Sequence, residues 1–129
     1  MTEFILDASA LMAMLREEPG AKKVADAIAG ASMGVFNYAE VVSYFIHAGM
    51  DQHVIDAMLD PLPIELVPAD KDLARLAGHL RGPTAEAGLS LGDRFCLALA
   101  KRKAVPAWTA DKGWQRIAAA VGVEVVTIR

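Results

Sequence analysis

The spacing of hydrophobic positions changes repeatedly along the 129-residue chain, from short continuous apolar runs to helical periodicity and back. Apolar runs of strand length predict five strands, over residues 2–6, 33–36, 64–67, 105–109 and 123–128. Between them, apolar residues recur every three or four positions. This period predicts helices over 8–20, 21–30, 37–49, 51–60, 70–82, 90–103 and 111–122, with a loop over 83–88.

Strands that alternate with helices are typical of βα units and of a parallel sheet covered by helices on both faces. The strands are apolar throughout, as expected when both faces of the sheet are buried. We therefore expect a single α/β domain over residues 1–129, with three α/β/α layers around a central parallel sheet of about five strands. In such sheets ligands bind beyond the carboxyl ends of the strands, where the strand order reverses.

Composition excludes several classes of protein. Hydrophobic residues make up 54% of the chain, charged residues 22%, and the mean hydropathy of +0.31 is too high for a disordered chain. No apolar run is long enough to span a bilayer, and no basic residue precedes the first one, so we expect no membrane association and a cytoplasmic location. Cys96 is the only cysteine, which excludes an intrachain disulfide and fits a reducing compartment. Its apolar neighbours predict a core position.

Acidic residues follow the predicted strands or begin the helices beside them. The carboxyl ends of parallel strands meet at one edge of a sheet, so we expect these side chains to lie near one another. They are Asp7, Glu40 with Asn37, Asp70, Asp93 and Asp111.

Helix capping is the alternative explanation for each of these acids. Asp7, Asp70 and Asp111 stand where an N-cap would, and Asn37 with Glu40 has capping-box spacing, as Ser90 has with Asp93. A shared site is favoured by the apolar residues that flank several of the acids. Carboxylates gathered in a partly dry pocket repel one another and need protons or a metal ion. Ligands that are all oxygen indicate Mg²⁺ or Mn²⁺.

Four segments, in this order and spacing, resemble the acidic motifs of PIN-domain nucleases, and most of all those of VapC-type toxins of bacterial toxin–antitoxin pairs. The resemblance covers essentially the whole chain, and the segments are FILDASALMAML (4–15), NYAEVVSYF (37–45), LSLGDRFCLALA (89–100) and WTADKGW (108–114). It implies an acidic site at Asp7, Glu40, Asp93 and Asp111, with hydroxyl groups from Ser9 and Thr109 beside it. Asp70 has no counterpart in these motifs and remains a predicted helix cap.

The resemblance also implies an activity: metal-assisted hydrolysis of RNA phosphodiester bonds by one or two Mg²⁺ or Mn²⁺ ions. We expect Asp7 and Asp93 to bind metal directly, and Glu40 and Asp111 to bind it directly or through water. Ser9 and Thr109 would orient the carboxylates or the water on the metal. The implied partners are an RNA substrate, a second copy of the chain in a homodimer, and an antitoxin.

The net charge of −3, with a pI near 5.5, at first opposes a nucleic-acid partner. Setting aside the four acids of the site changes this charge to +1. Arg94 and Lys112 each follow one of those acids and are the residues we predict to contact phosphate. The alternative for both is an ordinary solvated charge on a helix surface.

Two other functions remain open at this point. A PIN nuclease in housekeeping RNA processing would carry the same acids, and a non-catalytic binding module could retain them. The Asp7-Ala-Ser9 sequence after the first strand also suggests an aspartyl-phosphate phosphatase, but that class has a second aspartate where this chain has Ser9. The three histidines form no zinc motif, and no phosphate-binding glycine motif is present.

Overall fold

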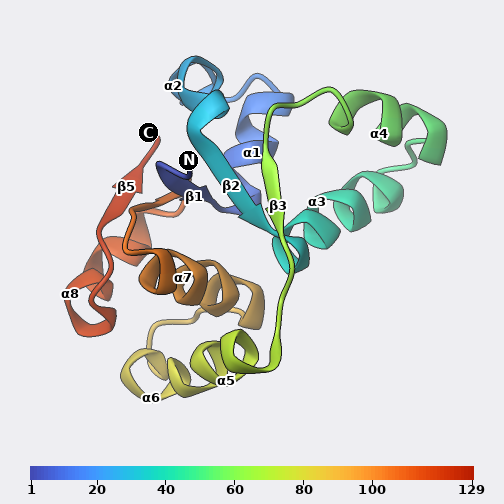
Figure 1. Cartoon of the computed structure of the whole chain (residues 1–129). Coiled ribbons are helices and arrows are strands. Elements are labelled where there is room, and N and C mark those ends of the chain that lie inside the picture. Colours follow the sequence, from blue (N-terminus) through green and yellow to red (C-terminus); the bar gives the residue numbers. More distant parts are fainter.

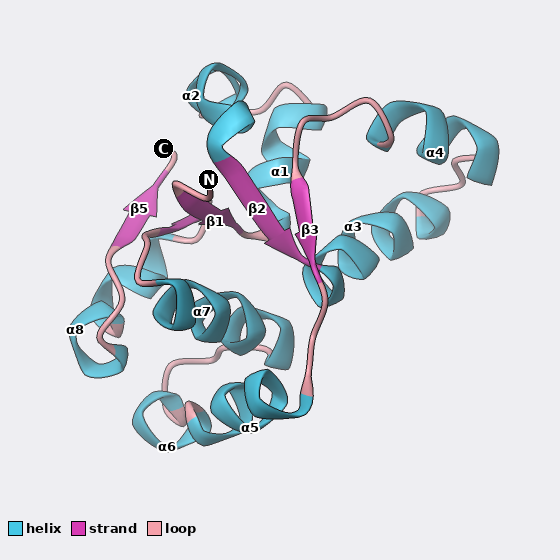
Figure 2. Ribbon diagram, in the orientation of Figure 1, coloured by secondary structure: helices cyan, strands magenta, loops and turns pink.

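The computed structural model describes residues 1–129 and has an α/β architecture in which helices surround a central sheet (Figures 1 and 2). The strands are β1 (Phe4–Leu6), β2 (Ala31–Gly34), β3 (Glu65–Val67), β4 (Ala107–Thr109) and β5 (Val125–Thr127). The α-helices are α1 (Ala8–Leu15), α2 (Ala21–Ala27), α3 (Val35–His47), α4 (Gln52–Leu59), α5 (Lys71–His79), α6 (Arg81–Thr84), α7 (Leu91–Lys103) and α8 (Ala118–Val121). Two 3₁₀ helices complete the fold, η1 (Ile28–Gly30) and η2 (Lys112–Arg116).

All five strands are parallel and lie in the order β3-β2-β1-β4-β5, which confirms the predicted sheet. The chain first builds outward from β1 through β2 to β3. It then returns to the other side of β1 with β4 and continues to β5. The strand order therefore reverses between β1 and β4, whose register pairs Leu6 with Trp108. This reversal is the place where open parallel sheets bind ligands.

The two faces of the sheet carry separate hydrophobic cores. On β1, Phe4 and Leu6 pack into the core that includes buried residues of α1, α3 and α4, whereas Ile5 packs into the core of α5, α7 and α8. Successive side chains of a strand point to opposite faces, so this central strand contributes to both layers. Cys96 is fully buried in the second core, as predicted.

The predicted second strand was displaced by two residues. Strand β2 covers Ala31–Gly34, which pairs with β1 and β3, and α3 already begins at Val35. Asn37 is therefore not the N-cap, because Gly34 holds that position and Asn37 lies within the first turn of α3. The predicted 83–88 loop begins in α6, and the last predicted helix is divided between η2 and α8.

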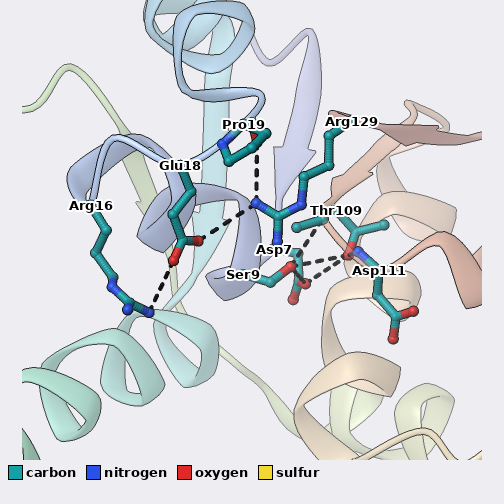
Figure 3. A network of polar contacts seen from close by, with 9 residues as sticks. Asp7, Ser9, Arg16, Glu18, Pro19, Thr109, Asp111 and Arg129 are labelled. Atoms are coloured by element: carbon teal, nitrogen blue, oxygen red, sulfur yellow. Dashed lines mark hydrogen bonds and ion pairs between the residues drawn. The ribbon is translucent and has the colours of Figure 1, made fainter.

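The carboxyl end of the chain is fixed against the turn between α1 and α2. Arg129 donates to the carbonyl of Pro19 at 3.1 Å and forms an ion pair with Glu18 at 3.5 Å (Figure 3). At that turn Gly20 has a φ of +96°, and a Cβ there would lie 2.7 Å from the Ile128 carbonyl oxygen. Glycine is the residue that allows this approach.

No helix in the chain combines the length and the apolar character that crossing a membrane requires.

Candidate metal centre

Asp7 lies at the reversal of strand order, directly after β1, and only 4% of its surface is exposed. It occupies the N-cap position of α1, but its side chain accepts no hydrogen bond from the helix backbone. The capping explanation is therefore wrong for this residue. A buried carboxylate that does not cap needs other partners, because an unpaired charge is costly to bury.

Two hydroxyl groups provide those partners. Ser9 and Thr109 donate to Oδ2 of Asp7 at 2.6 and 3.0 Å, and all three side chains point toward one another in Figure 3. Thr109 ends β4 and accepts from the backbone N–H of Asp111 at 3.1 Å, while Ser9 accepts from that of Ala110 at 3.0 Å. The hydroxyls thus join β1, α1 and the loop after β4 into one network around a single carboxylate oxygen.

Glu40 is held by Asn37 and by the start of α7. The side-chain amide of Asn37 donates to Oε1 of Glu40 at 2.9 Å and to the carbonyl of Gly92 at 3.0 Å. The Glu40 carboxylate lies so close to Gly92 that a Cβ at that glycine would overlap it. The pair therefore has capping-box spacing without forming a capping box, and instead connects α3 to α7.

Asp93 and Ser90 do form the predicted capping box. Ser90 accepts from the backbone N–H of Asp93 at 3.1 Å, and Oδ2 of Asp93 accepts from that of Ser90 at 2.9 Å. The box places the half-buried Asp93 in the first turn of α7, where the helix dipole favours negative charge. For this acid, capping and membership of a site are compatible.

Asp111 is more exposed than the other three acids. Its Oδ1 accepts from the backbone N–H of Gly113 at 2.8 Å and caps η2. In Figure 3 its carboxylate extends away from the hydroxyls around Asp7, although its backbone is joined to them through Thr109. Asp111 nevertheless lies close enough to Asp93 to raise the pKa of that carboxyl group.

The four carboxylates share one feature: each has one oxygen held by a protein donor and the other without a protein hydrogen bond. The held oxygens are Oδ2 of Asp7, Oε1 of Glu40, Oδ2 of Asp93 and Oδ1 of Asp111. The donors fix each carboxyl group in orientation. The second oxygen of each group has no protein hydrogen-bond partner.

Burial and mutual repulsion raise the pKa of three of these acids. Burial raises the pKa of Asp7 to about 6, with Asp93 and Glu40 adding to it and the hydroxyls of Ser9 and Thr109 opposing it. Burial likewise raises the pKa of Glu40 and that of Asp93. Each of these carboxylates is raised in pKa by at least one other carboxylate, so α3, α7 and the end of β1 bring them near one another. Such a group favours a bound proton or cation.

The residues fit a hydrated Mg²⁺ or Mn²⁺. No three acidic, histidine or cysteine side chains are grouped tightly enough to form a complete metal cage. Mg²⁺ does not require one, because it keeps several waters and takes one or two carboxylates. An all-oxygen donor set with no cysteine or histidine matches that ion and not zinc.

The two predicted phosphate contacts have different positions. Lys112 is exposed beside Asp111. The Arg94 side chain is 96% buried and donates to the hydroxyl of Thr84 at 2.9 Å and to its carbonyl at 3.4 Å. This position corrects the prediction for Arg94, because its guanidinium connects α7 to α6 and has little surface left for a phosphate.

The sequence did not reveal the supporting role of two residues beside Glu40. Gly92 leaves room for Glu40, and its only sequence signal is a glycine directly before an acid in the first turn of a helix. Asn37 was noticed as a cap, but its role in holding Glu40 depends on the packing of α3 against α7. Spacing along one helix does not reveal such a contact.

Comparison with known proteins places this geometry in a family context. The family model described as "PIN domain" matches residues 4–120. The search of curated proteins finds no match.

Solved structures of similar fold cover almost the whole chain. A toxin–antitoxin complex from Klebsiella pneumoniae has a chain 20% identical to this one, with 97% of each chain covered and a TM-score of 0.70. FitAcB from Neisseria gonorrhoeae is 18% identical, again with 97% of each chain covered, at a TM-score of 0.72. DNA-bound VapBC from Salmonella typhimurium is 14% identical, with 100% of each chain covered and a TM-score of 0.72. At these identities the similarity shows the fold.

Proposed function

The chain belongs to the PIN domain family, and from that premise we propose that it is a metal-dependent endoribonuclease and the toxin of a toxin–antitoxin pair. One observation carries the proposal. Asp7 and Asp111 follow the two strands between which the strand order reverses, and Glu40 and Asp93 lie near enough to Asp7 to raise its pKa. Each of the four carboxylates has one oxygen held by a protein donor and the other without one. This arrangement suits a divalent cation and a phosphodiester, whereas helix capping accounts for only Asp93 and Asp111 among the four acids.

The protein's own residues would hold the cation and orient its ligands. Asp7 and Asp93 are the proposed direct ligands; burial raises the pKa of each carboxyl group, and a hydrogen-bond donor fixes its orientation. Glu40 and Asp111 would bind directly or through water, and Ser9 and Thr109 would keep Oδ1 of Asp7 directed at the cation. When bound, Mg²⁺ or Mn²⁺ would activate a water for attack and stabilise negative charge on the phosphate. Lys112 would contribute positive charge beside Asp111.

Two partners follow from the same proposal. The similar structures include one described as a toxin–antitoxin complex and one described as a member of a family of toxin–antitoxin systems, so we propose that a cognate antitoxin inhibits this chain. An antitoxin arginine would pair well with an acidic pocket. We also propose that two copies of the chain associate and that the enzyme acts on cytoplasmic RNA. Expression that stops growth only in the absence of the antitoxin gene would distinguish a toxin from a housekeeping nuclease.

Cleavage of cellular RNA tests the activity itself. Purified wild-type protein and its Asp93→Asn variant would be incubated with total RNA in Mg²⁺, in Mn²⁺ and with chelator, and the new 5′ ends sequenced. We expect discrete cuts by the wild type with metal and none by the variant. A well-folded wild type that cuts nothing, or a variant that cuts equally, would contradict the proposal and favour a non-catalytic binding module.

A further inference from the structure

The largest cavity of the molecule runs along one face of α3 and includes one of the four acids, Glu40. It has a volume of about 510 Å³ and is lined by Phe36, Ala39, Glu40, Ser43, Tyr44 and His47. These residues follow one another at intervals of three or four, so they form a single stripe on the helix. Glu40 belongs both to this hollow and to the group of acids, which places any occupant of the hollow next to the proposed metal centre.

The hollow has an aromatic rim at the end nearest the acids. Phe36 is 37% exposed and stacks on Phe95 of α7, with ring centroids 4.6 Å apart and an interplanar angle of 12°. Phe36 lies one helical turn before Glu40, and Phe95 lies two residues after Asp93. Phe95 fixes the orientation of the Phe36 ring, whose remaining surface borders the hollow.

Further along the hollow the lining becomes more polar. Ser43 and His47 offer a hydroxyl and an imidazole, and the ring of Tyr44 lies between them on the helix. The guanidinium carbon of Arg16 lies 5.3 Å from the centre of that ring, outside the lining of the hollow, and the same guanidinium forms an ion pair with Glu18 at 3.2 Å. An aromatic surface with hydrogen-bonding groups beside it is what proteins use to bind unpaired bases of single-stranded RNA.

We propose that the hollow along α3 binds a nucleotide flanking the cleaved bond, with its base stacked on Phe36 and its edge read by Ser43 and His47. The proposal rests on the proposed ribonuclease activity and adds to it a subsite for one unpaired base at a fixed distance from the cut. The volume lies within the range of small-ligand sites. Continuity with the acids through Glu40 favours a nucleotide over a protein segment.

A pair of changes, one in the protein and one in the RNA, tests the contact. Phe36→Leu keeps an apolar side chain and removes the ring. Ile46→Ala is the matched control, because Ile46 is 50% exposed on the same helix and does not line the hollow. The substrate is a short single-stranded oligoribonucleotide that spans a cut mapped with the wild type. A set of abasic versions lacks one base at each position in turn.

We expect Phe36→Leu to reduce both cleavage and binding of the intact oligonucleotide about tenfold, in line with the effect of losing one stacked base. Binding would be measured by fluorescence anisotropy on the Asp93→Asn background, so that no RNA is cut. One abasic position should cause the same loss with the wild type. The same abasic oligonucleotide should cause no further loss with Phe36→Leu, because both changes remove one contact. Ile46→Ala should behave as the wild type.

Other results would overturn the proposal while leaving the nuclease intact. If the wild type cuts the RNA but Phe36→Leu and every abasic position leave affinity unchanged, no base stacks on this ring. If Phe36→Leu weakens self-association or antitoxin binding while RNA affinity is unchanged, the hollow is a protein interface. The abasic series uses the wild-type protein and remains decisive even if a variant misfolds. A wild type that neither binds nor cuts RNA would refute the proposed function as well.

Discussion

Asp7 and Asp70 both follow a strand region and precede a helix, yet the fold gives them opposite environments. Asp70 is exposed, its Oδ1 accepts from the backbone N–H of Leu73, and Arg102 donates to both of its oxygens at 2.6 and 3.1 Å. Asp7 is buried, caps nothing, and has no cationic partner among its hydrogen bonds. The pKa of Asp70 is lowered by Arg102 and by the Leu73 N–H, whereas burial raises that of Asp7.

The comparison shows which property distinguishes a carboxylate that can bind a ligand from one that only caps a helix. Every oxygen of Asp70 is already used by the protein, so nothing remains for a ligand. Asp7 has a free Oδ1 beside other carboxylates, and its charge is uncompensated until something else binds. The position of an acid after a strand therefore says little by itself. Its remaining hydrogen-bonding capacity and its neighbours decide whether it can act.

The largest expected difference between a site acid and the capping acid Asp70 is in the rate of RNA cleavage. Asp93→Asn should reduce RNA cleavage more than about a hundredfold, because loss of a direct ligand should exceed the tenfold to hundredfold cost of losing a residue that only supports one. Asp70→Asn should cut at the wild-type rate. Initial rates on a mapped RNA, measured with saturating Mg²⁺, give the ratio. Equal losses in both variants would remove the distinction between the two acids.

Asp7→Asn should stabilise the metal-free protein above pH 6. The pKa of Asp7 is about 6 in the folded state against 3.8 as its ordinary value, so the folded protein holds the proton more tightly. The wild type therefore loses stability as pH rises from about 4 to about 6, by up to about 3 kcal/mol. Asparagine does not titrate and avoids that loss. Urea unfolding in chelator across this range should show the two proteins converging below pH 4, and a gap that does not depend on pH would contradict the burial of an ionised group.

Removing a hydroxyl that holds Asp7 should reduce cleavage less than removing one of the carboxylates. Thr109→Val removes the donor to Asp7 and the acceptor for the Asp111 N–H with little change in shape. We expect cleavage to fall about tenfold to a hundredfold, with a similar loss of metal affinity. Thr127→Val is the matched control, since Thr127 lies opposite Thr109 in the sheet register and makes no side-chain hydrogen bond to the site. If both variants retain full activity, the hydroxyls do not position Asp7.

Substitution of Asp70 should have the smallest effect, a small change in folding stability. The dependence of this change on pH should be opposite to that for Asp7. The folded pKa of Asp70 is lowered, so its stabilising contribution is present above its ordinary value of 3.8 and disappears as pH falls through the folded value. Asp70→Asn keeps a capping side chain and loses the ion pair with Arg102. The variant should be slightly less stable than the wild type at pH 7, less so in high salt, and equal to it in strong acid. A stabilised variant would contradict this assignment.

The sequence predicted the architecture because the information for it is local. Apolar runs and helical periods identified the five parallel strands and most of the helices. The boundary between β2 and α3 was misplaced because Val35 and Phe36 have strand-like composition, whereas the residues that pair in the sheet are Ala31–Gly34. Tertiary pairing overrode local preference at that point.

The four acids and the two hydroxyls remain a prediction from the resemblance, whereas the contacts that support them come only from the structure. The contact of Asn37 with Gly92 spans 55 residues, and the stacking of Phe36 on Phe95 spans α3 and α7. For Arg94 the sequence suggested a function that the fold does not favour. An arginine beside an acid suggested a phosphate contact, whereas the fold buries this side chain against Thr84. Which way a side chain points depends on helix packing, which spacing does not encode.

The central claim is that Asp7, Glu40, Asp93 and Asp111 form one divalent cation site to which Asp70 does not belong. Calorimetric titration of the RNA-free protein with Mn²⁺ at pH 7 tests it most directly, using the wild type and the Asp7→Asn, Asp93→Asn and Asp70→Asn variants. The account predicts saturable binding by the wild type and by Asp70→Asn, and strongly weakened binding by the other two. Wild-type affinity in Asp7→Asn and Asp93→Asn, with both variants folded, would contradict it.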